Sequence, residues 1–161
     1  RPYGIRGMIW YQGERNSKDV PQAAHYRRQL ARLIGYYRRS WHDAAGGNVS
    51  RDFPFQFTQL PGWNPAQTEP VEGPRAPWAV NRESMRLVER DVANTGMVVA
   101  IDTGDEVELH PKNKKPLGIR HALLALRETY GHAVVGRGPR LQKHRVAGGQ
   151  IILSLIPSVR D

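Results

Sequence analysis

The fold of this chain is decided by the segment Met97-Val-Val-Ala-Ile-Asp-Thr-Gly-Asp-Glu-Val-Glu-Leu-His110. Its apolar first part, residues 97–101, predicts a buried strand, and its second part predicts an acidic loop that carries His110. A neutral imidazole acts as a general base where a carboxylate fixes its tautomer and stabilises the cation formed on proton transfer. The segment therefore suits hydrolytic chemistry, and the alternative is a solvated acidic turn with an ordinary loop histidine.

A second polar loop follows an apolar stretch near the start of the sequence. Residues 7–11 predict a short buried strand that runs into Gln12-Gly-Glu-Arg-Asn16. Open α/β folds bind their ligands at the carboxyl ends of such strands. Gln12 and Asn16 can donate amide N–H groups there, and Gly13 allows close approach of the backbone. The alternative interpretation is a plain turn.

The remaining periodicities predict alternating helices and strands. We expect a helix that has Asp19 at its cap and Pro21 in its first turn and that ends at residues 44–48. We also expect a strand within residues 53–60, a helix over 79–92 and a helix over 116–129. The order β-α-β-loop-α-β-α predicts a mostly parallel sheet with helices on its faces. The Pro-rich and Gly-rich loop over residues 61–77 is typical of a lid or a mobile excursion.

The first of these helices holds many of the basic residues. Apolar and aromatic side chains at helical spacing predict a core-facing stripe, and the arginines are expected on a solvated face: Arg27, Arg28, Arg32, Arg38 and Arg39. The net charge of +9 raises nucleic acid as a partner. The sequence has no recognition motif or interleaved stacking aromatics, so we expect a general basic surface and no nucleic-acid partner.

Composition excludes several kinds of chemistry. The chain has no cysteine, which rules out disulfides, zinc-thiolate sites and a thiol nucleophile. Its 6 histidines lack metalloprotease spacing, and we expect no metal and no cofactor. No apolar run has the length of a membrane span, so no membrane partner is expected. The first residues, Arg1-Pro-Tyr-Gly-Ile5, lack an initiator methionine and a signal-peptide pattern, which predicts a fragment of a longer chain.

The character of the sequence changes after Val134. Residues 136–139 form a cluster of Gly and Pro, and residues 141–146 and 151–156 predict a β-hairpin. We therefore predict a main domain over residues 1–135 and the start of a β-rich element over residues 136–161.

Two segments together resemble a known family. Residues 6–16 are similar to the "GviWYQGEsN" segment of the sialate O-acetylesterases, a carbohydrate-esterase branch of the SGNH hydrolase superfamily. Residues 102–114 resemble that family's "D-GD---iHPkNK" segment. The resemblance implies a three-layer α/β/α flavodoxin-like fold, partial here and with a β-rich C-terminal tail. It also implies a Ser-His-acid site that removes acetyl esters from sugars, chiefly sialic acids.

The resemblance also implies roles for residues of the acidic loop. His110 corresponds to the general base of the family. Its acid partner is Glu108, where relatives often carry Asp, or alternatively Asp105. Arg82 matches an "Arg-Glu" helix start and is expected to be a scaffold residue.

The polar loop after the first strand matches the oxyanion segment of the superfamily. The resemblance assigns Gln12, Gly13 and Asn16 to oxyanion or substrate binding. Glu14 either organises this loop or forms a structural salt bridge.

One part of the family pattern is missing. Relatives carry the nucleophile in an early "GQSNM"-like segment, which this sequence lacks. Its serines are Ser17, Ser40, Ser50, Ser84, Ser154 and Ser158, and none lies in a nucleophile-elbow motif. We therefore expect a carboxylic ester hydrolase by resemblance whose isolated chain has little or no activity. The alternative is a non-catalytic carbohydrate-binding or interaction domain.

The expected partner is an acetylated, sialic-acid-like carbohydrate. A missing first strand would also expose a sheet edge, which predicts a homo-oligomer formed through that edge. Relatives point to a secreted or periplasmic location without fixing the compartment.

Overall fold

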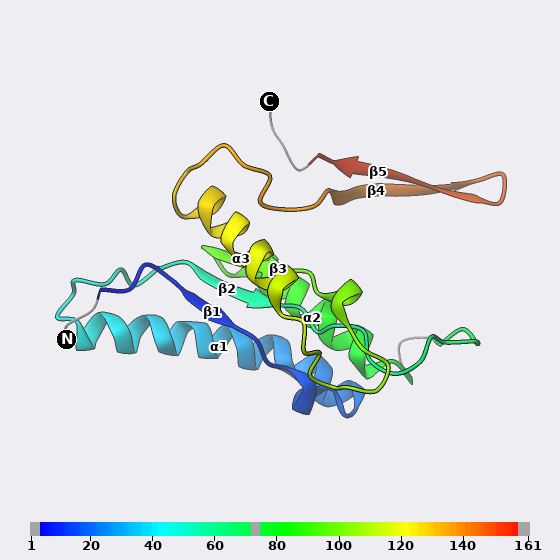
Figure 1. Ribbon diagram of the computed structural model, residues 1–161, viewed down its shortest axis with the longest axis horizontal. Coiled ribbons are helices and arrows are strands. Elements are labelled where there is room, and N and C mark those ends of the chain that lie inside the picture. The colour runs from blue at the N-terminus through cyan, green and yellow to red at the C-terminus, as the bar shows by residue number, and fades with distance from the viewer. Residues whose placement is uncertain (1–3, 72–74, 158–161) are drawn as a thin grey trace. The chain divides into compact units, whose positions relative to one another are not determined.

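The computed structural model describes residues 4–71 and 75–157 of the chain. These belong to two units, Arg1–Gly118 and Ile119–Asp161 (Figure 1). The sequence boundary near Gly136, between domains 1–135 and 136–161, stays a prediction.

The first unit contains a parallel three-stranded sheet. Its strands are β1 (Met8–Trp10), β2 (Phe55–Thr58) and β3 (Thr95–Val98), in the spatial order β1-β2-β3. The chain moves across the sheet in one direction, so two right-handed crossovers place both connecting helices on one face. These helices are α1 (Val20–Ala44) and α2 (Pro77–Asp91), and they pack against each other. The predicted parallel sheet is confirmed.

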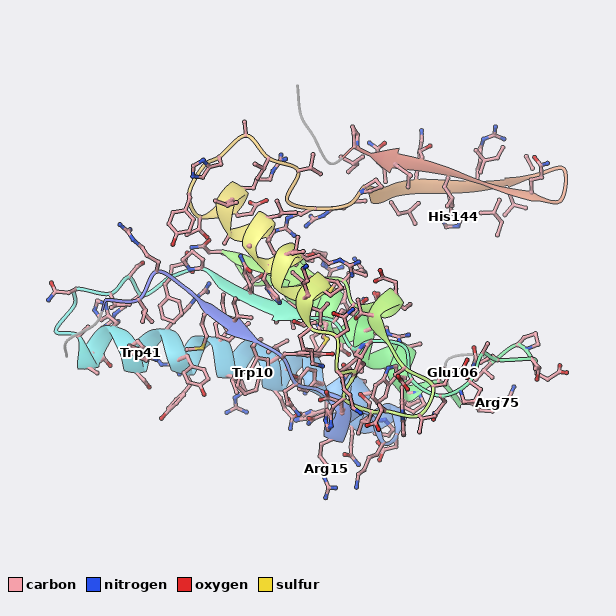
Figure 2. All side chains as sticks on the ribbon, viewed as in Figure 1. Trp10, Arg15, Trp41, Arg75, Glu106 and His144 are labelled. Atoms are coloured by element: carbon pink, nitrogen blue, oxygen red, sulfur yellow. The ribbon has the colours of Figure 1, made fainter. Side chains whose placement is uncertain are left out.

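The core lies between this face of the sheet and the two helices. Alternate residues of a strand point to the same side, and Phe55 and Phe57 of β2 are fully buried there. Trp10 of β1 packs against this cluster beside α1 (Figure 2). The helices contribute the buried residues Tyr26, Leu30, Ile34, Met85 and Val88.

Helix α1 begins and ends as its sequence predicts. The Asp19 side chain accepts a hydrogen bond from the Gln22 backbone N–H at 2.8 Å, and Pro21 occupies the first turn. Gly46 and Gly47 have positive φ angles of 59° and 86° just beyond its last residue, a conformation that glycine adopts without steric strain.

The prediction that all five arginines of α1 face solvent is wrong for Arg38. Its residue is 7% exposed. The guanidinium donates hydrogen bonds to the carbonyl oxygens of Phe53, Ala93 and Asn94, which precede β2 and β3. A buried cation is tolerated here because the ends of neighbouring segments supply acceptors.

The third strand begins earlier than its apolar run predicts. We expected residues 97–101, whereas β3 spans Thr95–Val98 and Ile101–Thr103 forms the short helix η3. Asn94 has a φ of 55° and turns the chain directly into register with β2. The strand then ends where the pairing with β2 ends, although the apolar residues continue.

The remaining elements match their predicted types. Helix α3 (Lys115–Glu128) begins in the first unit and continues into the second, and Gly131 follows it with a φ of 71°. In the second unit, β4 (Arg140–Ala147) and β5 (Gln150–Ile156) form the predicted antiparallel hairpin. Within the described ranges, every helix is too short or too polar to serve as a membrane span.

Candidate active site

The two segments singled out in the sequence meet beyond the ends of the strands. The chain leaves β1 into Gln12 and Gly13 and forms the short helix η1 (Glu14–Ser17). The loop after η3 carries His110, whose Nε2 lies 4.0 Å from Oε1 of Glu14. The structure therefore brings the imidazole and the polar loop together.

Glu14 connects the backbone of its loop to this histidine. Its Oε2 accepts a hydrogen bond from the Gly13 N–H at 2.9 Å, and its side chain is 15% exposed. The His110 side chain is 74% exposed. A separation of 4.0 Å is an electrostatic contact and is too long for a hydrogen bond. The arrangement places a held carboxylate beside an imidazole that solvent and ligands can reach.

The assignment of Glu108 or Asp105 as the acid partner of His110 stays a prediction. Oδ1 of Asp105 accepts hydrogen bonds from the N–H groups of Val107 and Glu108, both at 2.9 Å. These bonds hold the pKa of Asp105 below its ordinary value. Within residues 4–71 and 75–157, neither Asp105 nor Glu108 forms an ion pair with His110. Asp105 shapes the turn that leads to the histidine, and Glu108 is exposed.

A chain of hydrogen bonds orients the amides of the polar loop. Trp10 Nε1 donates to the Tyr26 hydroxyl at 3.3 Å, and this hydroxyl lies 3.0 Å from Gln12 Oε1. Gln12 Nε2 donates to Asn16 Oδ1, and Asn16 Nδ2 donates to Gln29 Oε1, each at 2.9 Å. A cavity of about 130 Å³ lies beside these residues. Each amide nitrogen keeps a second N–H for another acceptor.

Sequence reasoning missed two members of this chain, Tyr26 and Gln29. Burial raises the pKa of Tyr26 to about 12, so its hydroxyl stays protonated and remains a donor at neutral pH. Tyr26 was predicted only as a core residue, and Gln29 was not assigned a role. The available signal was their spacing of three residues, which places Tyr26 and Gln29 on the same side of α1.

Two glycines allow the loops after β2 and β3 to touch. A Cβ atom on Gly104 would lie 1.9 Å from the Gly62 carbonyl oxygen, closer than any side chain permits. Arg82 holds the same region, because its guanidinium donates to the carbonyl oxygens of Leu60 and Pro61 at 2.9 and 2.6 Å. Arg82 therefore has the scaffold contacts that we expected of it.

The predicted lid over residues 61–77 is only partly described, since residues 72–74 lie outside the described ranges. Its anchors are visible. Trp78 Nε1 donates to the Pro61 carbonyl oxygen at 2.7 Å, and the rings of Trp63 and Trp78 are 5.5 Å apart.

Two of the described serines donate hydrogen bonds to backbone carbonyl oxygens. Ser17 donates to the Gly13 carbonyl oxygen, and Ser84 donates to the Ala23 carbonyl oxygen. No serine hydroxyl hydrogen-bonds to His110 in the part of the chain that the structure describes. Ser158 and the first residues, 1–3, lie outside it.

Asn81 is an unusual residue beneath the polar loop. Gly13 has a φ of 152°, and a Cβ atom there would lie 3.0 Å from Met85 Cε and 3.3 Å from Asn81 Oδ1. Asn81 is fully buried, and among the described residues neither its Nδ2 nor its Oδ1 has a hydrogen-bond partner. A buried amide without partners destabilises the folded state.

Replacing Asn81 with leucine should therefore stabilise the chain. Leucine has a similar shape and carries no polar atoms to desolvate, so we expect the free energy of unfolding to rise by about 1–2 kcal/mol. Urea denaturation followed by circular dichroism measures the change. The same substitution at exposed Asn48 is the control. A loss of stability in Asn81→Leu would show that the amide is hydrogen-bonded in solution.

Comparison with known proteins identifies the family. A family model described as "Carbohydrate esterase, sialic acid-specific acetylesterase" matches residues 2–127. The chain belongs to this family. The resemblance that the sequence motifs carry is thereby confirmed.

Three similar proteins are all longer than this chain. The sialate O-acetylesterase of Mus musculus is 29% identical and that of Rattus norvegicus 28%, each over 94% of this chain. The chain spans 28% of the length of each. The crystal structure of a carbohydrate acetylesterase from Xanthomonas citri is similar with a TM-score of 0.77 and 33% identity. That match covers 98% of this chain and 34% of the other.

Proposed function

We propose that this chain forms the histidine-bearing part of a carbohydrate O-acetylesterase site that hydrolyses acetyl esters of sialic-acid-like sugars. In this proposal the mechanism is of the Ser-His-acid type, and this chain lacks the nucleophile. The observation that carries the proposal is the placement of His110 4.0 Å from Glu14, next to the loop of Gln12 and Asn16. The names of the rodent relatives support the acetylated sugar as substrate.

His110 would act as the general base in this mechanism. It takes the proton of the attacking hydroxyl while that oxygen bonds to the acetyl carbon, and it returns the proton to the departing sugar oxygen. The acetyl group is then transferred to water with the same histidine as base. Glu14 is the carboxylate best placed to stabilise the imidazolium cation. Asp105 and Glu108 would contribute by shaping the loop that carries the base.

Gln12 and Asn16 would stabilise the oxyanion that forms on the acetyl oxygen. Their orientation is held by the hydrogen-bond chain from Tyr26 to Gln29. Amide groups that are fixed before the reaction stabilise developing charge without reorganising. Gly13 permits the backbone to approach, as the sequence motif implies. The proposal also includes a three-layer α/β/α fold, of which this chain supplies a part.

The proposal is tested with a 9-O-acetylated sialoside and its deacetylated form. We expect the isolated chain to hydrolyse the ester at close to the background rate, because it lacks the attacking hydroxyl. We also expect the acetylated probe, and much less the deacetylated one, to shift the NMR signals of His110 and the Gln12 side-chain amide.

His110→Gln should weaken binding of the acetylated probe, and His132→Gln is the matched exposed control. Equal binding of both sialosides, unaffected by His110→Gln, would favour a non-catalytic sugar-binding domain. Robust ester turnover that serine-directed inhibitors do not reduce would contradict the Ser-His-acid mechanism.

A further inference from the structure

One face of α1 carries basic side chains that the proposed ester site does not use. Arg28, Arg32 and Arg39 are exposed. Residues spaced three or four apart share a side of a helix, and these lie opposite the buried residues Leu30 and Ile34. We call Arg28, Arg32, Gly35 and Arg39 the basic stripe.

Among the described residues, the arginines of the basic stripe form no ion pair with an acid. Arg27 pairs with Asp91, and Arg38 pairs with Asp52. By contrast, no ion pair or hydrogen bond involves the guanidinium groups of the stripe within the described ranges. Arg28 and Arg32 also stand four residues apart, where like charges repel each other on a helix. An anionic partner bound to the basic stripe would therefore reduce this repulsion.

The stripe also contains a glycine that packing does not require. Gly35 lies in the interior of α1, where glycine destabilises a helix relative to alanine. A Cβ atom on Gly35 would meet only Nη1 of Arg39, at 3.2 Å, which is the tip of a flexible side chain. Because Gly35 has no side chain, the flexible Arg39 guanidinium lies over the helix backbone here, and Gly35 is partly exposed. The next residue, Tyr36, is 61% exposed.

We propose that the basic stripe docks an anionic glycan, namely the sialic-acid-containing chain that carries the acetyl ester, outside the ester-cleaving site. Arginine matches carboxylates with its planar pair of N–H donors. Arg28 and Arg39 are about 16 Å apart along the helix axis, a span that contacts more than one sugar unit. A shift of the Arg39 side chain would let a sugar ring approach the helix backbone at Gly35. This inference rests on the proposed function for its ligand class.

Polysialic acid is the probe, and its affinity is measured by fluorescence anisotropy at several salt concentrations. The triple variant Arg28→Gln, Arg32→Gln, Arg39→Gln should bind at least tenfold more weakly than the unchanged chain, with a smaller salt dependence. The control variant Arg6→Gln, Arg51→Gln, Arg145→Gln removes the same charge from other exposed positions. It should lose less than threefold.

The variant Gly35→Ala separates docking at the stripe from a general effect of positive charge, because it leaves every charge in place. We expect it to raise the melting temperature, because alanine favours the helix, and to weaken polysialic acid binding severalfold. Equal losses in the stripe and control variants would reduce the effect to net charge and overturn the proposal. RNA binding as tight as that of polysialic acid, with the same dependence on the stripe, would overturn it in favour of a general polyanion surface.

The two proposals can fail independently. The monomeric 9-O-acetylated sialoside should perturb His110 equally in the unchanged chain and in the stripe variant. If it does, and polysialic acid binding ignores the stripe, only the docking proposal is wrong. If the monomeric sialoside leaves His110 unperturbed while polysialic acid binding still requires the stripe, the proposed ester site is wrong and the proposed docking surface is retained.

Discussion

Arg38→Leu should lower the free energy of unfolding by about 2–4 kcal/mol, since a buried carbonyl oxygen left without a hydrogen bond costs about 1–3 kcal/mol. The Arg38 guanidinium donates to the Phe53 carbonyl oxygen from Nε and Nη2, at 3.1 and 3.0 Å. Nη2 also donates to Ala93 and Asn94, at 3.0 and 2.9 Å. Nη1 forms an ion pair with Asp52 at 2.9 Å.

The large effect follows from what these acceptors do. Phe53 precedes β2, and Asn94 precedes β3, so one side chain of α1 holds the starts of two neighbouring strands. Leucine cannot donate a hydrogen bond, so the carbonyl oxygens of Phe53 and Ala93 lose the Arg38 donors, whereas that of Asn94 keeps its bond from the Phe55 N–H at 3.0 Å. The salt bridge to exposed Asp52 contributes little by comparison.

Two variants make the Arg38 result specific. Arg38→Lys keeps the positive charge but loses the fork of donors, so we expect a loss between those of the native chain and Arg38→Leu. Arg39→Leu changes the exposed neighbour and should alter stability by less than about 0.5 kcal/mol. Urea denaturation measures all three. A loss below about 1 kcal/mol in Arg38→Leu would mean that these hydrogen bonds do not hold the strands.

The features predicted correctly from the sequence depend on local signals. Asp19 and Pro21 mark the start of α1 through its own backbone, and Gly46 marks its end through its own φ angle. The alternation of strands and helices then restricts the sheet to parallel pairing, because short right-handed connections leave few other arrangements. The two family motifs contain His110 and Glu14, which the structure places 4.0 Å apart.

The features that the sequence did not reveal depend on neighbours in space. Helical spacing places Arg38 beside the core, but it cannot show that three carbonyl oxygens lie within hydrogen-bond distance of the guanidinium. Glu14 and His110 are far apart in the sequence, so their proximity requires the fold. The assignment of Glu108 or Asp105 as acid partner came from the family resemblance and stays a prediction. Gln29 belongs to the hydrogen-bond chain only because η1 brings Asn16 against α1. Each of these requires the fold before the contact can be named.

Acidification from pH 7.5 to pH 5 should lower the free energy of unfolding by about 2 kcal/mol through His121 alone. This residue of α3 is 5% exposed, and its burial lowers the pKa from 6.5 to about 4. Burial acts in this direction because it disfavours the charged imidazolium. Below pH 6.5 the unfolded chain therefore binds a proton at His121 that the folded chain does not bind.

The sign and the pH window follow from this difference. The folded state has its full advantage above the unfolded pKa of 6.5, and that advantage is lost as the pH falls toward the folded pKa of about 4. By pH 4 the loss reaches about 3 kcal/mol. Carboxylates whose pKa is lowered by folding, such as Asp105 and Asp91, act mainly below this window, because their ordinary pKa is 3.8.

His121→Leu provides the decisive comparison. Leucine cannot take up a proton, so the variant should lose much less stability than the native chain between pH 7.5 and pH 5. His132→Leu, at an exposed position, should keep the native pH dependence. Denaturant titrations at each pH measure the difference. If native chain and His121→Leu lose stability in parallel across this window, the buried imidazole is not the group that links folding to acid, and protonation elsewhere carries the effect.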